Sequence, residues 1–275
     1  MSDLTLPRTA PAAAASERPA RPRVRLGAWI GLVLPVLCVV AWQVVADARI
    51  VTPDLLPSPA AVLRALAELA ASGELVAHLE ATLARMALGF AAGAAAGTVA
   101  GALTGAIPLA RRLVDPTVQA LRSVPSIAWV PLFIIWLGIF EGSKIALIAV
   151  GVFFPVYLNL MAGIAGVDRK LIEVGRVHGF SPLRVLWRIQ LPAAMPAYVT
   201  GLRGGLGLGW MFVAAAELMG ASEGLGFLLT DGEQTGRPAV VIGAILLFAI
   251  CGKLTDVGVE WLGGRLVAWQ DTVKP

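Results

Sequence analysis

The residues LIEVGRVHGFSPLRVLWRIQLPAAMP, at positions 171–196, form a short amphipathic stretch between two long apolar ones. Apolar residues recur at helical spacing on both sides of Gly179, which predicts two short helices joined by a turn, because glycine accepts the positive φ such a turn requires. Ser181 followed by proline is a typical start of the second helix. We expect Pro192 and Pro196 to end that helix and to begin the next apolar segment.

The second of these helices carries two arginines, Arg184 and Arg188, which share one face because they are four residues apart. Leucines and a tryptophan occupy another face. A compact amphipathic unit of this kind is suited to docking against a soluble partner protein. An ordinary basic loop held near anionic lipid is equally compatible with the pattern, so the residues alone leave both interpretations open.

Apolar residues make up 57% of the 275 residues and charged residues only 15%, with a mean hydropathy of +0.79. So few charges cannot cover a soluble domain, and the long apolar runs exclude an unstructured chain. A membrane-spanning helix needs about 20 mainly apolar residues. The stretches that qualify are residues 26–46, 83–108, 118–140, 145–167, 196–220 and 239–262. The sequence therefore predicts an all-α, polytopic membrane protein with six transmembrane helices.

The first predicted span has one feature of a signal peptide, because the Ala-Asp-Ala at residues 46–48 resembles a cleavage site. Its apolar region is longer than the roughly 7–15 residues of such peptides, which favours a retained span. Residues 1–25 are rich in Ala, Pro and Arg, and we expect them to form a disordered cytoplasmic tail. Residues 26–275 are expected to form a single transmembrane domain, with a cytoplasmic loop at about 168–195.

Basic residues concentrate in the tail and in the loops after the second and fourth predicted spans, which all lie on one side of the membrane. They are Arg8, Arg18, Arg21, Arg23, Arg25, Arg111, Arg112, Arg169, Lys170, Arg176, Arg184 and Arg188. The loops on the other side are acidic. This asymmetry predicts that both termini are cytoplasmic. It also accounts for the net charge of +4 without a nucleic-acid partner.

The outer segment at residues 57–80 is too polar to be a span. Leucines recur there at helical spacing, with Arg64 and Glu68 interleaved. The pattern favours an amphipathic helix lying at the outer membrane interface, with a partly ordered loop as the alternative.

The stretch at 171–196 resembles the EAA loop of ABC-importer permeases. That loop has Glu-Ala-Ala, three residues, Gly, nine residues, Ile, one residue and Leu-Pro. The anchors at matching positions are Glu173, Gly179, Ile189, Leu191 and Pro192. Val174 and Gly175 replace the two alanines, and a glycine in a helix interior costs about 1 kcal/mol relative to alanine.

In that family the loop is the coupling helix, which sits in a groove of the ATPase subunit. The resemblance implies a type I ABC-importer permease fold and assigns ATPase coupling to Glu173 and Gly179, with Arg184 and Arg188 as nearby contacts. It also implies a homodimer in the bacterial inner membrane, with two ATPase subunits on the cytoplasmic face. A periplasmic substrate-binding protein would deliver the substrate to the outer face.

The sequence has no phosphate-binding loop, because Gly252-Lys253 is followed by leucine rather than Ser or Thr. ATP hydrolysis must therefore come from another polypeptide, and we expect this subunit not to be an enzyme. Metal-ligand and cofactor motifs are also missing from the sequence. Cys38 and Cys251 lie in apolar stretches and are interpreted as small buried hydrophobic residues.

Further motifs resemble the nitrate/sulfonate/taurine branch of these permeases. They are LPSP at 56–59, WVPL at 129–132, WLG at 136–138, AEL at 216–218 and GLG at 224–226. VDR at 167–169 and GKL at 252–254 are most similar to aliphatic-sulfonate permeases. The resemblance implies import of small organosulfur anions, most directly aliphatic sulfonates, with taurine or nitrate as alternatives. A secondary transporter or an intramembrane enzyme is a more remote alternative, since the sequence has neither a convincing inverted repeat nor paired catalytic groups.

Ionisable and polar residues within the predicted spans are costly and require a role. We expect Glu217, Arg203 and Asn159 to be candidates for the translocation pathway. Alternatively, Glu217 caps a neighbouring helix or pairs across spans, Arg203 extends to the cytoplasm, and Asn159 bonds between helices. Lys253 and Asp256, three residues apart, are expected to pair on one helix face.

Glycine is the most regularly placed residue of the chain. Every fourth residue through the second predicted span is a glycine: Gly89, Gly93, Gly97, Gly101 and Gly105. Gly201, Gly205 and Gly209 repeat the pattern in the fifth predicted span. Small residues at this spacing let helix backbones approach closely in lipid. We expect the longer stripe to pack tightly, either within the subunit or between two copies.

Overall fold

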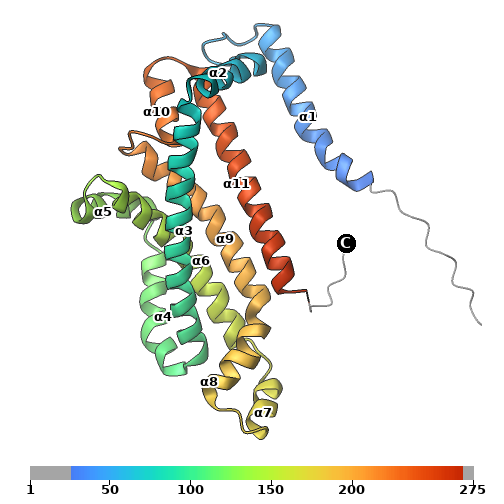
Figure 1. Cartoon of the computed structure of the whole chain (residues 1–275), viewed down its shortest axis with the longest axis vertical. Helices are drawn as coiled ribbons and strands as arrows, with labels where there is room; N and C mark the ends of the chain where they lie inside the picture. Colours follow the sequence, from blue (N-terminus) through green and yellow to red (C-terminus); the bar gives the residue numbers. More distant parts are fainter. Residues whose placement is uncertain (1–25, 269–275) are drawn as a thin grey trace, which may run out of the picture.

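The computed structural model describes residues 26–268, which form helices and connecting turns with no strand among them (Figure 1). The helices are α1 (Leu26–Asp47), α2 (Pro59–Ser72), α3 (Glu74–Ala106), α4 (Pro108–Arg122), the 3-10 turn η1 (Ser126–Trp129), α5 (Val130–Leu137), α6 (Glu141–Ala165), α7 (Arg169–Val177), α8 (Pro182–Val185), the π turn η2 (Leu186–Gln190), α9 (Leu191–Leu218), α10 (Leu225–Gln234) and α11 (Pro238–Leu266). The all-α prediction is confirmed. The tail predicted at residues 1–25 lies outside the described residues.

Within the described residues, four helices are long and apolar enough to cross a membrane: α3, α6, the continuous helix Pro182–Leu218, and α11. A fifth crossing exists if the bent pair of α4 and the segment Ile127–Leu137 is counted as one. Helix α1 has 22 residues and coincides with the first predicted span. Its part Val33–Asp47 is by itself shorter than a crossing. The expected number of six is therefore not reproduced as six straight spans.

Residues 118–140 do not form a single straight span as predicted, because the chain turns by 91° between α4 and the following segment. Pro125 lies at this bend, where it lacks a backbone N–H and restricts the preceding residue. Helix α4 is also strongly amphipathic, with Arg111, Arg112 and Asp115 in its first half. The result is an arm, α5, that projects sideways from the bundle (Figure 1).

The second predicted span begins nine residues earlier than expected, since α3 starts at Glu74 rather than at residue 83. The amphipathic outer helix is present as α2, with the Ser58 hydroxyl accepting a hydrogen bond from the Ala61 amide at 3.2 Å. Gly73, at φ +85°, ends α2 and allows α3 to follow at once. The outer segment is therefore one short helix and the first turns of a long one.

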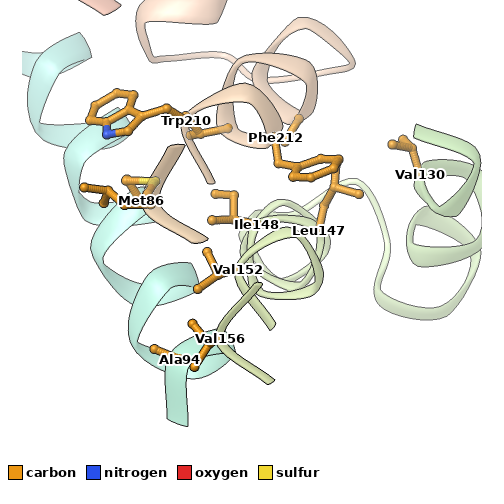
Figure 2. Close-up of a cluster of buried hydrophobic side chains, with 12 residues drawn as sticks. Met86, Ala94, Val130, Leu147, Ile148, Val152, Val156, Trp210 and Phe212 are labelled. Carbon is orange, nitrogen blue, oxygen red and sulfur yellow. The ribbon is translucent and has the colours of Figure 1, made fainter. Parts of the chain in front are cut away.

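The core of the bundle is α6, which lies between α3 and α9. Figure 2 shows the buried side chains that meet there: Met86 and Ala94 from α3, Leu147, Ile148, Val152 and Val156 from α6, Trp210 and Phe212 from α9, and Val130 from α5. Ile148, Val152 and Val156 have no exposed surface. Each of α6's two neighbours is held by apolar contacts along several turns.

The glycine stripe of α3 faces α6 of the same chain along its whole length. A Cβ atom placed on Gly97 would lie 2.9 Å from the backbone oxygen of Phe153, and one on Gly101 would lie 2.9 Å from that of Tyr157. The shorter stripe of α9 approaches α6 from the other side, where a Cβ on Gly201 would lie 3.0 Å from the Pro155 oxygen. Real Cβ atoms need more room against backbone, so these helices can be this close only with glycine.

Candidate functional site

The loop at residues 168–195 folds as the compact unit that its sequence predicts. Asp168 caps α7, with its carboxylate accepting a hydrogen bond from the Lys170 amide at 2.9 Å. One turn into the helix, Glu173 pairs with Arg169 at 3.0 Å, and both side chains are more than half exposed. Glu173 is therefore accessible to a partner protein.

Gly179 makes the turn that ends α7. Its φ is +73°, and the amide of the next residue, Phe180, bonds back to the Gly175 carbonyl at 3.0 Å. This six-residue closure is the Schellman motif, in which glycine takes the left-handed position that other residues occupy only with strain. Gly179 therefore sets the direction of the chain between α7 and α8.

Gly175, which departs from the family pattern, lies buried where α7 meets the π turn η2. A Cβ at this position would lie 2.5 Å from Ile189 Cδ1, the end of a flexible side chain. Ile189 is one of the residues that match the EAA loop pattern. Gly175 and Ile189, fourteen residues apart, are therefore in contact within the loop. The missing methyl group lets the two segments pack together, which offsets the low helix propensity of glycine.

The prediction that Pro192 and Pro196 end the second helix is wrong. The helix runs without a break from Pro182 to Leu218. In the π turn η2 the Leu191 amide bonds to the Leu186 carbonyl, five residues back, and this change of register leads into a segment where Pro192 has no N–H to offer. The loop is consequently joined to the core helix α9 by continuous helix.

The unit of residues 169–190, which we call the coupling unit, lies at the tip of the bundle (Figure 1) and exposes apolar side chains. The exposed fractions of Leu171, Val174, Val177, Leu183 and Trp187 lie between 50% and 85%. Arg184 and Arg188 are exposed beside them, and the Arg184 guanidinium lies 5.6 Å from the centre of the Phe180 ring. Apolar side chains with a basic rim are typical of a protein-docking surface.

A second candidate site is a group of polar side chains inside the bundle. It includes Glu217 of α9, whose side chain is completely buried. Its carboxylate accepts hydrogen bonds from the Thr82 hydroxyl at 2.8 Å, from the Arg85 guanidinium at 2.7 Å and from the Gly226 amide at 2.8 Å. These contacts correspond to the alternative prediction for Glu217, in which its carboxylate caps a neighbouring helix or pairs across spans. A solute does not reach it in this conformation.

The capped helix is α10, which lacks an N-cap side chain of its own. Three successive amides at its start bond to other helices instead. Gly224 donates to His78 Nδ1 at 3.0 Å, Leu225 donates to the Thr82 hydroxyl at 2.8 Å, and the third donates to Glu217. A helix end buried without such partners would be costly, so α3 and α9 together hold α10 in place.

Arg85 is the functional candidate that sequence reasoning missed. Each of its guanidinium nitrogens is bonded: to Glu141 through Nε and Nη2, and to Glu217 and the Glu223 carbonyl through Nη1. Lys144 shares the same Glu141 carboxylate at 2.8 Å. An arginine within an apolar span is itself a signal for a buried pair. Its partners, however, are 56 and 132 residues away.

The other two pathway candidates are bonded within the protein. Arg203 makes a two-pronged pair with Asp256 of α11 at 2.9 and 3.0 Å and also contacts Glu260 at 3.1 Å. Lys253 lies 3.5 Å from Asp256, as their spacing predicts. Asn159 donates to the Pro155 carbonyl one turn back at 2.9 Å, beside the proline in α6. The structure does not bring Glu217, Arg203 and Asn159 together in one contact set.

A family model described as "binding-protein-dependent transport system inner membrane component" matches residues 89–267, from the glycine stripe of α3 to the end of α11. The protein belongs to this family. The Bacillus subtilis (strain 168) protein named as aliphatic sulfonates transport permease SsuC is 42% identical, with 92% of this chain and 91% of that protein aligned. The Escherichia coli (strain K12) taurine transport system permease protein TauC is 37% identical, with 85% and 86% aligned.

Among solved structures, a chain of the inward-facing MetNI methionine ABC transporter aligns with a TM-score of 0.53 and 22% identity. The alignment covers 72% of this chain and 94% of that one, and it shows a shared fold. The type I permease fold is therefore confirmed. Membership of the family makes this permease a multi-pass inner-membrane component of a transport system, not an enzyme, and implies an ATPase and a substrate-binding protein as partners.

Proposed function

We propose that this permease forms the inner-membrane path of an ATP-driven importer for small organosulfur anions, in the first place aliphatic sulfonates. The observation that carries the substrate class is the 42% identity to a sulfonate permease across nearly the whole of both chains. The taurine permease is also similar over most of its length, and taurine is itself a sulfonate, so it is the second candidate.

We infer that two copies of the permease build one path and that each copy docks one ATPase on its coupling unit. The exposed apolar side chains of this unit and their basic rim supply the docking surface. Both chain termini and the coupling unit lie on the cytoplasmic side, an orientation that the positive-inside rule supports. Residues Glu173 and Gly179 act in coupling, one through its exposed carboxylate and the other through the turn.

The structure suggests how ATP-driven movement reaches the membrane. The coupling unit continues into α9 without a break, and α9 is packed backbone to backbone on α6, which is packed in the same way on α3. A displacement of the unit by closing ATPase subunits therefore moves these three helices as one body. Rigid-body rocking of this kind exposes the path alternately to the two sides.

The test is uptake of radiolabelled ethanesulfonate into vesicles that contain the permease and its ATPase, with the loaded binding protein on the outside. We expect uptake that requires ATP and that unlabelled hexanesulfonate and taurine inhibit more strongly than nitrate. Replacing residues 180–190 by a glycine-serine linker should abolish it. Uptake without ATP, or uptake that survives this replacement, contradicts the proposal.

A further inference from the structure

A narrow pocket lies between the arm α5, the start of α6 and the far end of α9, away from the coupling unit. Phe133 and Ile134 of the arm form one wall, and Leu147 and Met219 form the other. Among the described residues that line it, Lys144 is the one with a charged side chain. The pocket is thus a mostly apolar cleft whose lining includes one lysine.

Lys144 is buried, with 7% of its surface exposed. The hydrogen bond that its ammonium group makes within the described part of the chain is to Glu141 at 2.8 Å. An ammonium group can donate three hydrogen bonds, so it has capacity for another acceptor. A buried cation is costly unless it is paired, and any group that replaces Glu141 must therefore be an anion.

Glu141 can be replaced because it does not depend on Lys144. Its carboxylate is also bonded to Arg85 through two guanidinium nitrogens, and 55% of its side chain is exposed. Arg85 in turn is held by Glu217 and by a backbone carbonyl. If an incoming anion binds Lys144 in place of Glu141, Glu141 remains bonded to Arg85 through two guanidinium nitrogens. Neither charge is then left unpaired.

We propose that Lys144 binds the anionic head of the transported solute, and that the apolar walls of the pocket accept its alkyl chain. This inference rests on the proposed function and names a residue and a ligand shape for it: a sulfonate with a short hydrocarbon tail. An ammonium group recognises charge rather than planar geometry, so the walls, not Lys144, discriminate against anions without a tail.

The pocket is narrow in this conformation. Its cavity volume of about 20 Å³ is too small for a sulfonate. A sulfonate therefore enters only when α5 moves outward. Two features are compatible with such movement: Gly138, at φ +76°, follows the arm directly, and Ile135 and Trp136 of the arm are 77% and 63% exposed.

The experiment uses the purified complex of the permease with its ATPase, without binding protein. Ethanesulfonate is the probe with a tail and sulfate is the probe without one. Binding is measured by calorimetry in the nucleotide-free and in the vanadate-trapped complex. We expect ethanesulfonate to bind in one of the two states and more tightly than sulfate. Lys144→Met should weaken binding at least about tenfold, because it removes a charge-assisted hydrogen bond, whereas Lys144→Arg should retain most of it.

Two further variants sharpen the test. Glu141→Gln removes the competing carboxylate charge and should strengthen ethanesulfonate binding, the opposite direction from Lys144→Met. Lys253→Met, which removes a lysine that is 70% exposed on α11, is the matched control and should bind as the wild type does. Size-exclusion chromatography of each complex shows whether the variant assembles.

The inference is overturned if neither state of the wild-type complex binds ethanesulfonate, or if assembled Lys144→Met binds it as tightly as the wild type. It is also overturned if Lys144→Arg loses as much affinity as Lys144→Met, because the charge would then not be what matters. Failure of the proposed function looks different: wild-type vesicles supplied with loaded binding protein and ATP would take up no sulfonate at all.

Discussion

Glu217 and Arg85, 132 residues apart in the chain, form an ion pair at 2.7 Å in which the two side chains are 0% and 6% exposed. The pair joins α9 to α3 away from the coupling unit. Through Glu141 and the Glu223 carbonyl, the same arginine also reaches the start of α6 and the loop before α10. One guanidinium group thus fixes four segments of the chain.

Removing one partner of this pair should destabilise the permease strongly. Breaking a buried pair typically costs about 3–5 kcal/mol, because the remaining charge is left without compensation. We expect Arg85→Met and Glu217→Gln each to lower the thermal unfolding temperature in detergent, and the double variant to lose less than the sum of the two. Additive losses in this double-mutant cycle would show that the two side chains do not interact as the structure indicates.

The glycine stripe should not tolerate a large side chain. In Gly97→Leu the new Cβ would meet the Phe153 backbone, which cannot move without separating α3 from α6. We expect little monodisperse protein by fluorescence-detected size-exclusion chromatography. Gly207→Leu is the matched control, because a Cβ there meets nothing within 4 Å, and it should behave as the wild type. Normal assembly and transport by Gly97→Leu would refute this account of the stripe.

The apolar tip of the coupling unit should bind the ATPase without supporting the fold. Trp187 is 65% exposed, so Trp187→Ala should leave the unfolding temperature within about 1 °C, as for surface substitutions generally. It should markedly reduce the amount of ATPase that co-purifies. Trp136→Ala, at 63% exposure on the arm, is the control that should retain the ATPase. If both variants retain the same amount of ATPase, the docking surface does not include Trp187.

The turn at Gly179 should be sensitive to any side chain. A β-branched residue there is strained at φ +73°, at a cost of about 1–3 kcal/mol. We expect Gly179→Val to uncouple transport from ATP hydrolysis, so that the binding protein no longer stimulates the ATPase. Gly258→Val on α11, where a Cβ meets nothing within 4 Å, is the control. If the binding protein still stimulates the ATPase fully in Gly179→Val, Gly179 has no role in coupling.

Arg203 can be tested by exchanging it with its partner. If its role is to hold α9 to α11 through Asp256, Arg203→Asp and Asp256→Arg should each impair uptake, and the double exchange should restore much of it. If Arg203 instead attracts the transported anion, the exchange moves the positive charge to another helix and uptake stays low. Because both side chains are more than a quarter exposed, we expect the effect on stability to be small.

Much of the architecture follows from local patterns. Apolar periodicity predicts the long helices, and the Ser58 and Asp168 caps, together with Gly73 and Gly179, mark where helices begin and end. Such features depend on residues within one or two turns, so they are visible in the sequence. The spacing of the coupling unit and its resemblance to a known loop were sufficient to identify the family.

Other features have no local signal. The bend before the arm α5 separates segments that both look apolar or helical, and the prolines after the coupling unit look like breaks although a π turn carries the helix through them. Both depend on what the neighbouring helices offer as packing surfaces. A pattern of single residues records helix propensity but not these surfaces.

The sequence by itself determined that this protein is a helical membrane permease, with a loop that resembles the coupling loop of its family and with a glycine stripe for close packing. Only the tertiary structure decided that the stripe faces α6 of the same chain, that Glu217 is buried against Arg85 and the start of α10, and that Lys144 lies in an apolar pocket beside the arm. The physical reason is range: helix formation and membrane insertion depend on the nearest few residues, whereas a buried charge is placed by partners from distant helices.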